Sequence, residues 1–155
     1  MRRLIWPLSL LLSFGSTAAL SAERPDHNRP ALNRLAGPVP AEVLRVIDGD
    51  TIEVRAHIWL GQEVTTLVRL ARIDAPELKG KCASERAAAQ TAKARLEDKV
   101  GGTEVTLRDI RFEKYAGRVM SRVETEAGED LAAALKREGL VRAYGGAKRQ
   151  SWCAG

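Results

Sequence analysis

Apolar and polar residues alternate along several parts of this chain, and the alternation predicts strands. Between Thr51 and Ile58 every second side chain is apolar, which is the period of a strand with one buried face. The apolar members are Ile52, Val54, Ala56 and Ile58. Val43–Ile47 predicts a partner strand, and Asp48-Gly49-Asp50 supplies the turn between the two. Three further stretches complete a predicted set of five strands: 64–73, 105–107 and 119–123.

Two other stretches have apolar residues at helical spacing. The first follows Ser84, an expected N-cap, and runs to Val100, where Gly101-Gly102 ends the pattern. The second runs from about Asp130 to Glu138 and ends before a glycine. Three strands, a helix, two strands and a helix predict an α+β, mainly β fold: a five-stranded Greek-key barrel of the OB type with two or more helices. A small α+β sheet would give a similar pattern.

The N-terminal residues differ from the rest of the chain. Residues 1–22 combine two arginines, an apolar run and a stretch of small residues, and this order predicts a secretory signal peptide. The alternative is an uncleaved membrane anchor, although the apolar run is short for a span. Residues 23–40 hold four of the six prolines and no apolar period, so we expect a linker there and a single domain over 41–155. The mature protein is then expected in the periplasm or outside the cell, without membrane contact.

Charge and cysteine content fit this picture. Residues 1–22 carry two of the 25 basic residues and no acidic residue, so the remainder has 23 basic against 20 acidic residues and a net charge of +3. This mild excess permits a polyanionic partner but does not identify one. Cys82 and Cys153 are the two cysteines, and an exported chain with an even count favours one disulfide between them. Two separate thiols are the alternative.

Charged residues gather in three short segments: Ile47-Asp48-Gly49-Asp50-Thr51, Arg69-Leu70-Ala71-Arg72-Ile73-Asp74-Ala75-Pro76-Glu77, and Lys114-Tyr115-Ala116-Gly117-Arg118. Each alone is explained by a turn, a strand edge or a loop cap. Together they place Asp50, Asp74 and Glu77 at strand ends, where the loops of a barrel meet, and acids that meet require a proton or a cation. Ligands that are all oxygen favour Ca²⁺ or Mg²⁺, and arginines beside such an ion form a receptor for phosphate.

These segments resemble the motifs of the thermonuclease, or staphylococcal-nuclease-like, family. The resemblance runs from Val43 to Tyr144 and rests on D-G-D-T, then R-L-x-x-[IV]-D-x-P-E, then Y-G-R, which are specific as a set. It implies the five-stranded barrel with helices, and it implies a calcium-dependent endonuclease that hydrolyses the phosphodiester bonds of DNA, RNA or both.

The resemblance also implies roles for single residues. Three would hold the metal, Ca²⁺ or alternatively Mg²⁺ or another hard divalent ion: Asp50 and Asp74 through carboxylates and Ala75 through its carbonyl. Three would act on the bond that is cut: Glu77 on the attacking water, and Arg69 and Arg118 on the phosphate. Three match positions that contact the substrate's terminal phosphate or base: Lys114, Tyr115 and Tyr144.

The sequence departs from the family pattern at three places. Ala75 replaces a threonine of the best-known member, which is harmless if only the carbonyl is used. Ala116 lengthens the turn before Arg118 by one residue and changes the direction from which that arginine approaches. The chain ends soon after Tyr144, so the tail around Trp152 is expected to be held by the cysteine bridge, which would also steady the loop after Glu77.

Two alternatives to an exported nuclease remain. One is a non-catalytic OB-fold module that binds nucleic acid or oligosaccharide, and the other is an exported structural domain that uses a metal for stability. A binding module has no use for a clustered acid trio, and a structural domain has none for the two arginines. We therefore expect a nucleic-acid substrate, no stable protein partner and a monomer, with the preference between DNA and RNA left open.

Overall fold

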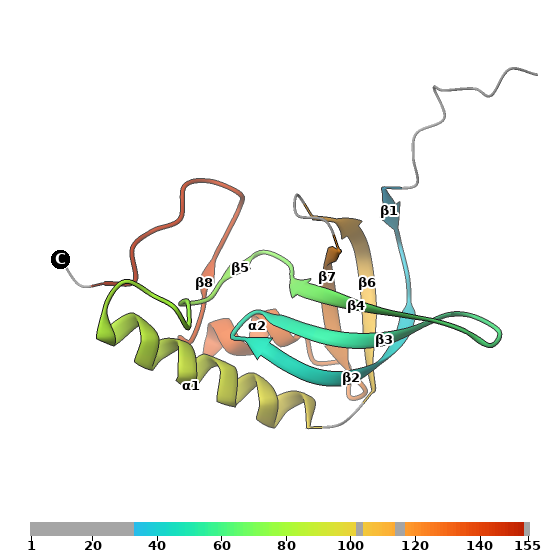
Figure 1. Cartoon of the computed structure of the whole chain (residues 1–155). Helices are drawn as coiled ribbons and strands as arrows, with labels where there is room; N and C mark the ends of the chain where they lie inside the picture. The colour runs from blue at the N-terminus through green and yellow to red at the C-terminus, as the bar shows by residue number, and fades with distance from the viewer. Residues whose placement is uncertain (1–32, 102–103, 114–116, 154–155) are drawn as a thin grey trace, which may run out of the picture. The chain divides into compact units, whose positions relative to one another are not determined.

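Five strands close into a barrel in the computed structural model, which describes residues 33–101, 104–113 and 117–153. They are β2 (Val39–Asp48), β3 (Thr51–Trp59), β4 (Gln62–Leu70), β6 (Glu104–Phe112) and β7 (Arg118–Thr125). The sheet order is β6-β2-β3-β4-β7, and pairing of β6 with β7 closes it. Only the β4–β7 pair is parallel among these described strands. The expected OB-type α+β fold is confirmed (Figure 1).

The barrel interior is filled by the apolar side chains that alternation identified. Ile52 and Val54 of β3 are fully buried, together with Val68, Leu107 and Val123 from three other strands. Ile58 differs from the expectation, because its side chain is 50% exposed. The reason is that β3 and β4 continue beyond the barrel as a projecting hairpin, which Figure 1 shows at the end opposite the helices.

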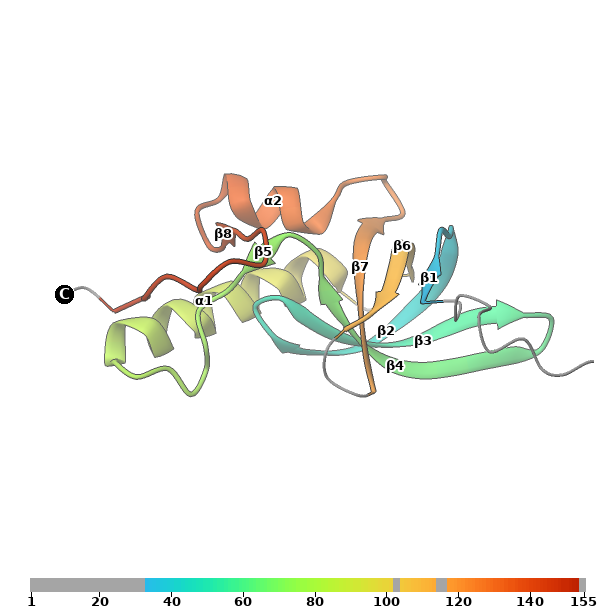
Figure 2. The ribbon, with the colours of Figure 1, turned by 90° about the horizontal axis from the view of Figure 1, so that it is seen from above.

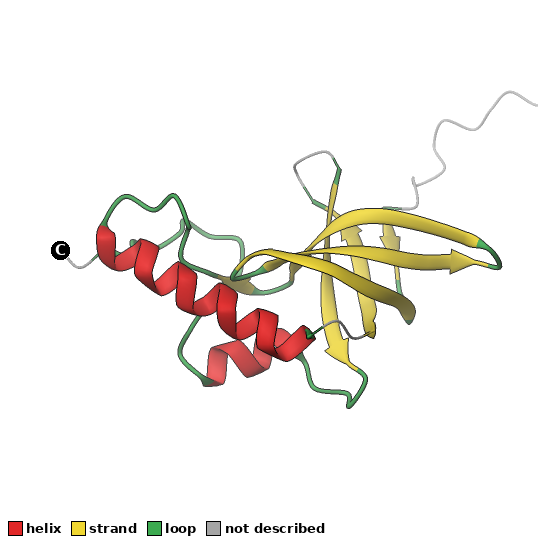
Figure 3. Ribbon diagram, turned by 60° about the horizontal axis from the view of Figure 1, so that its bottom comes forward, coloured by secondary structure: helices red, strands yellow, loops and turns green. Residues whose placement is uncertain are grey.

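Both predicted helices are present. α1 (Ala83–Val100) packs on β2, and α2 (Leu131–Arg137) packs on β7. Figures 2 and 3 show the two helices together at one end of the barrel. No helix in the described part of the chain is long and apolar enough to cross a membrane.

The start of α1 differs from the prediction. Its N-cap is Cys82 rather than Ser84, and Cys82 makes no side-chain capping bond. Extended backbone at Cys82 (φ −128°, ψ 162°) starts the helix two residues earlier, so Ser84 lies inside the first turn. At α2 the side chain of Asp130 does cap, since it accepts from the amide of Ala133 at 2.9 Å.

Sheet pairing extends on the N-terminal side of residue 41. Val39 pairs with Leu107 of β6, and the short strand β1 (Arg34–Leu35) also pairs with β6. Residues 34–35 and 39–40 are therefore strand, within the stretch expected to be linker. The predicted signal peptide, residues 1–22, and the linker up to residue 32 lie outside the described residues.

The third predicted strand is interrupted near its end. β4 stops at Leu70, Arg72 adopts a left-handed backbone (φ 66°), and the chain resumes as β5 (Ile73–Asp74). β5 pairs with β8 (Arg142–Ala143) instead of continuing in the barrel. This small second sheet brings the C-terminal residues beside Asp74.

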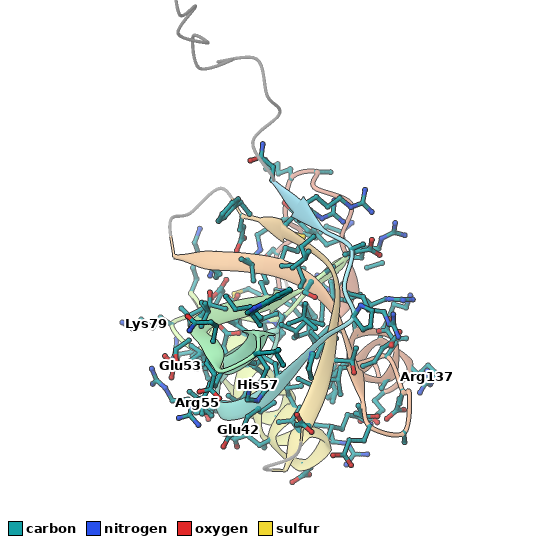
Figure 4. All side chains as sticks on the ribbon, turned by 90° about the vertical axis from the view of Figure 1, so that its right-hand side faces the viewer. Glu42, Glu53, Arg55, His57, Lys79 and Arg137 are labelled. Atoms are coloured by element: carbon teal, nitrogen blue, oxygen red, sulfur yellow. A yellow bond between two sulfur atoms is a disulfide. The ribbon has the colours of Figure 1, made fainter. Side chains whose placement is uncertain are left out.

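Two further features complete the description of the fold. Cys82 and Cys153 form a disulfide, as expected, and tie the end of the chain to the start of α1. On the surface of β2 and β3, Figure 4 shows Glu42, Arg55 and His57 close together, away from Arg137. Arg55 pairs with Glu42 at 2.6 Å, and His57 Nδ1 lies 3.1 Å from a carboxylate oxygen of Glu63, so this histidine has a polar partner on the surface.

Candidate active site

Asp50 is held in the tight turn between β2 and β3. Thr51 Oγ1 donates to one carboxylate oxygen at 2.9 Å, and Arg69 Nη2 donates to the other at 2.9 Å. Burial raises the pKa of Asp50 to about 6, the neighbouring charge of Arg69 lowers it, and Asp48 raises it. Asp50 is therefore a buried, well-oriented carboxylate whose negative charge is only partly compensated.

Close packing fixes this turn against α1. A Cβ built on Gly49 would lie 2.8 Å from the Cβ of Ala92 and 3.1 Å from that of Ala75, so only glycine fits without a shift of these neighbours. The amide of Ala75 in turn points toward Asp50 Oδ2 at 3.4 Å. Asp50 and the Asp74–Ala75 segment are thus packed as one unit.

Asp74 faces the same guanidinium as Asp50. It is the last residue of β5 and is buried, and Arg69 Nη2 lies 3.9 Å from its Oδ1. Arg69 comes from β4, directly beside Thr51 in the β3–β4 register. The structure therefore places Arg69 beside two of the three acids that the sequence predicted would meet, Asp50 and Asp74.

Glu113 links the two arginines assigned to the phosphate, and the sequence reasoning missed it. One carboxylate oxygen lies 3.6 Å from Arg69 Nη1, and the other pairs with Nε of Arg118. The Glu113 side chain is only 9% exposed, so both ion pairs are well shielded from water. The available signal was its position, because Glu113 directly precedes the segment from Lys114 to Arg118 that was already singled out.

Glu77 stands on the loop between β5 and α1 and is exposed. A second acid, Glu85 of α1, holds this loop from beneath: its carboxylate accepts from the amide of Lys81 at 3.0 Å and from that of Glu77 at 3.5 Å. Gly80 packs directly on Glu85, since a Cβ there would lie 2.5 Å from the Glu85 side chain. Glu85 therefore fixes the backbone from which Glu77 projects.

Arg149 of the C-terminal tail enters the acid cluster, and this contact was also missed. Its guanidinium pairs with Asp74 Oδ1 through Nε, donates to Glu77 Oε1 at 2.5 Å through Nη1, and donates to the Ala75 carbonyl at 3.3 Å through Nη2. Burial opposes the charged form, but the hydrogen bonds to Glu77 and Asp74 outweigh it and raise the pKa of Arg149. The basic tail and the cysteine expected to anchor it were the signals in the sequence.

The tail is held at several points around Arg149. Trp152 Nε1 donates to Asp74 Oδ2 at 3.1 Å, so both oxygens of that carboxylate are bound by the tail. The guanidinium of Arg142 lies 3.8 Å from the centre of the Trp152 ring and also donates to the Ser151 carbonyl at 2.9 Å. The disulfide follows at Cys153. Trp152 is thus an anchor of the tail, as expected, and also a hydrogen-bond donor to Asp74.

Several of these groups line one hollow of about 640 Å³. Asp74 and Ala75 lie beside it and are joined to it by Arg149, which is part of its wall. Among the predicted site residues its walls include Asp50, Arg69, Glu77, Arg118 and Tyr144. Tyr144 is placed there by its amide, which donates to the carbonyl of Arg72 at 2.9 Å. Lys114, Tyr115 and the extra residue Ala116 lie outside the described residues, so the structure does not test their expected roles.

The oxygen groups in and beside this hollow fit a hard divalent cation. The carboxylates of Asp50 and Asp74 and the carbonyl of Ala75 are the donor type that Ca²⁺ and Mg²⁺ prefer. Two observations support the fit: Asp50 has a raised pKa that a nearby cation would lower, and a guanidinium already contacts both Asp74 and the Ala75 carbonyl. A second group of donors, Cys82, Glu85 and Cys153, is unsuited, because both sulfurs are consumed by the disulfide.

Comparison with known proteins agrees with this geometry. Residues 67–152 match the model of the family described as staphylococcal nuclease homologue. The chain is also 34% identical over 110 residues to a micrococcal nuclease from Shigella flexneri, a match that covers 66% of this chain and 57% of that protein. The family match includes Arg69, Asp74, Glu77 and Arg118, and it extends to Trp152 of the tail. The chain belongs to the staphylococcal nuclease homologue family.

Proposed function

We propose that this protein is an exported, metal-dependent nuclease that hydrolyses phosphodiester bonds of DNA, RNA or both. The observation that carries the proposal is the convergence of one buried carboxylate, one exposed carboxylate and two arginines on one hollow. The second buried carboxylate, that of Asp74, lies beside this hollow, 3.9 Å from Arg69. A fold that only bound nucleic acid would need the basic groups but not the buried acids, which carry a desolvation penalty.

The residues that would hold the cation are Asp50, Asp74 and Ala75. When bound there, a hard divalent ion, Ca²⁺ in our proposal, supplies positive charge that neutralises the phosphate and stabilises the charge developing on it. Thr51 and the turn around Gly49 keep Asp50 oriented, so the ligand set needs little reorganisation. Because Arg149 bonds to Asp74 and to the Ala75 carbonyl, its guanidinium has to leave these groups for the ion to use them.

Three side chains would carry the chemistry of cleavage. Glu77 orients the attacking water and takes its proton, a contribution of about 10²–10⁴-fold when such a base is well placed. Arg69 donates to the phosphate oxygens and stabilises the additional negative charge of the transition state. Arg118 does the same on the side of the leaving group. Each well-aimed donor of this kind contributes about 3–4 kcal/mol in other enzymes.

Glu113 would act as a positioning residue in this scheme. It pairs with both arginines, so it fixes the distance between two guanidinium groups that would otherwise repel. Its carboxylate lines the same hollow, and in this scheme it acts through the two arginines rather than on the substrate. Tyr144, on the wall of the hollow, offers a ring on which a base can stack without sequence preference.

Export and a monomeric state complete the proposal. Residues 1–22 have the order of a signal peptide, and the Cys82–Cys153 disulfide is of the kind that persists in oxidising compartments. The proposal places the protein in the periplasm or outside the cell. The monomer is part of the proposal because, within the described residues, one chain supplies the acids and both arginines of the site.

The test is cleavage of single-stranded DNA by the purified protein with Ca²⁺, with chelator, and after Ca²⁺ is restored. We expect cleavage that stops with chelator and returns with the ion. Asp74→Asn should abolish this dependence together with activity, whereas Asp98→Asn, a change of an exposed acid on α1, should leave both intact. DNA that is bound but never cut under any divalent ion would replace the nuclease by a non-catalytic binding module.

A further inference from the structure

A second hollow adjoins the candidate active site. Its volume is about 670 Å³, and it shares four wall residues with the first hollow: Arg69, Met120, Tyr144 and Gly146. The two spaces therefore meet along a common wall that carries one of the phosphate-binding arginines. A chain molecule that passes through the active site can continue into this second space.

The second hollow is lined by cations and by no acidic side chain of the described residues. Besides Arg69, its walls contain Arg72, Arg111 and Lys136, which we call the basic cradle. These residues come from three places in the fold: the turn between β4 and β5, the end of β6, and α2. Packing of the barrel and helix thus brings together three positive charges that are far apart in the sequence.

The side chains of the basic cradle form no ion pair in the described part of the chain, although the charge of Arg111 helps to lower the pKa of Asp109. Within the described ranges, the side chains of Arg72 and Arg111 have no ion pair or hydrogen bond, whereas every other described arginine has at least one partner. Lys136 likewise has no ion pair there, although its neighbour Arg137 pairs with Glu129 at 2.8 Å. A fold that pairs its other described arginines leaves these two free in one hollow.

Arg72 also occupies an unfavourable backbone conformation. Its φ of 66° lies in the left-handed region, which glycine adopts readily and other L residues adopt at a cost of about 1–2 kcal/mol. The hydrogen bond from the amide of Tyr144 to the carbonyl of Arg72 holds it in that conformation. A glycine would remove this strain, so the presence of arginine indicates that its side chain has a use.

We propose that the basic cradle binds the phosphates of the nucleotides that flank the cleaved bond in single-stranded nucleic acid. The proposal rests on the nuclease function proposed above, and it extends that function to the adjacent part of the substrate. Separate cations along a groove suit a flexible backbone that carries one charge per nucleotide. Tyr144 stands at the junction of the two hollows, where an unpaired base can stack while its neighbours' phosphates lie on either side.

Fluorescence anisotropy of a labelled 12-nucleotide oligo(dT), measured in chelator so that no cleavage occurs, tests this inference. The variant Arg72→Gln/Arg111→Gln/Lys136→Gln should bind about 10–100-fold more weakly. The slope of log affinity against log salt concentration should become shallower by about 2, because each single-strand phosphate that is no longer neutralised reduces it by about 0.7. The matched control Arg45→Gln/Arg137→Gln/Lys93→Gln removes the same residue types and charge from paired surface positions, and it should resemble the wild type. Figure 4 shows Arg137 pointing outward.

Three outcomes would overturn the inference. Equal weakening by the cradle variant and the control would mean that only overall charge matters. Thymidine monophosphate could also displace the oligonucleotide completely from the wild-type protein at concentrations near the Kd of the monophosphate. That result would indicate a pocket for a single nucleotide. Equal weakening for a 12-base-pair duplex would contradict binding of a single strand.

A short substrate separates this inference from the proposed function. Thymidine 5′-monophosphate p-nitrophenyl ester contains only the phosphate that is cleaved, so it offers no flanking phosphate to the basic cradle. The cradle variant should hydrolyse it at the wild-type rate if the inference is right. If the wild type cleaves neither this ester nor DNA, the proposed nuclease function fails, independently of what the anisotropy measurement shows.

Discussion

Arg149→Gln should make the protein bind Ca²⁺ more tightly. In the structure the guanidinium of Arg149 is bonded to Asp74, Glu77 and the Ala75 carbonyl, two of which are groups proposed to hold the ion. The ion and the guanidinium compete for the same oxygen atoms. A site that is blocked for most of the time binds its ligand more weakly, in proportion to the fraction of molecules that are open.

The magnitude follows from the hydrogen bonds that the guanidinium makes to the proposed metal ligands. Two charge-assisted hydrogen bonds contribute about 1.5–3 kcal/mol each when shielded from water. The Arg149 side chain is 40% exposed, so solvent screening reduces their sum to about 1.4–2.8 kcal/mol. Because about 1.4 kcal/mol corresponds to a factor of ten, the Kd for Ca²⁺ should fall about 10–100-fold.

Isothermal titration with Ca²⁺ measures this Kd directly and does not depend on activity. Lys148→Gln is the matched control, since it removes the same charge from the adjacent residue, for which the described structure shows no ion pair. We expect a tighter Kd for Arg149→Gln alone. An unchanged or weaker Kd in Arg149→Gln, or an equal change in the control, would refute the competition between guanidinium and metal.

Three further predictions concern the surroundings of the site. Cys82→Ser/Cys153→Ser should lower the free energy of unfolding, measured in urea, by about 4 kcal/mol, because the bridge closes a long loop in the unfolded chain. A loss below about 1 kcal/mol would show that loop entropy does not account for the role of the bridge. Burial raises the pKa of Asp50 from 3.8 to about 6, so the folded state holds a proton that the unfolded state releases between these values, and stability falls as pH rises through this window. In chelator, the stability of Asp50→Asn relative to wild type should therefore rise by up to about 3 kcal/mol between about pH 3.5 and pH 7, and a pH-independent difference would contradict the shifted pKa. Glu113→Gln should lower kcat on DNA about 10–100-fold, because Arg69 and Arg118 lose their alignment. The change in KM should be smaller, and the affinity for Ca²⁺ should stay the same. A change in KM alone would reassign Glu113 to substrate binding.

The barrel was predictable because its strands and helices carry their own periodicity. Alternation identified the buried face of β3 at Ile52 and Val54, and helical spacing identified α1 up to Val100. The end of β3 was less predictable, since an apolar residue such as Ile58 fits the period whether or not the barrel covers it. The N-cap of α1 was missed because backbone geometry at the disulfide, rather than a capping side chain, determines where that helix begins.

The acids and arginines of the site were found because their spacing forms a family motif. In the structure Arg69 lies 2.9 Å from Asp50 and 3.9 Å from Asp74. Glu113 and Arg149 belong to no such spacing. Arg149 is 75 residues from Asp74 along the chain, and only the folded tail brings them together.

The basic cradle had no sequence signal at all. Arg72 and Lys136 are ordinary basic residues in a chain with 25 of them, and their significance depends on which charges remain unpaired after folding. Pairing of this kind is a property of three-dimensional packing, so it cannot be read from composition or periodicity. The left-handed backbone at Arg72 could not be predicted either, because this conformation is expected for glycine and not for arginine.

The proposed action of Glu77 on water is tested most directly by the single-turnover rate of single-stranded DNA cleavage by Glu77→Gln at saturating Ca²⁺. We predict a rate about 10²–10⁴-fold below wild type, with oligonucleotide affinity retained. Glu63→Gln, a change of an acid in the projecting hairpin, should cleave at the wild-type rate. If Glu77→Gln cleaved DNA at the wild-type rate, the assignment of Glu77 as the base would be contradicted. If the wild-type protein itself did not cleave DNA, the nuclease function would be contradicted.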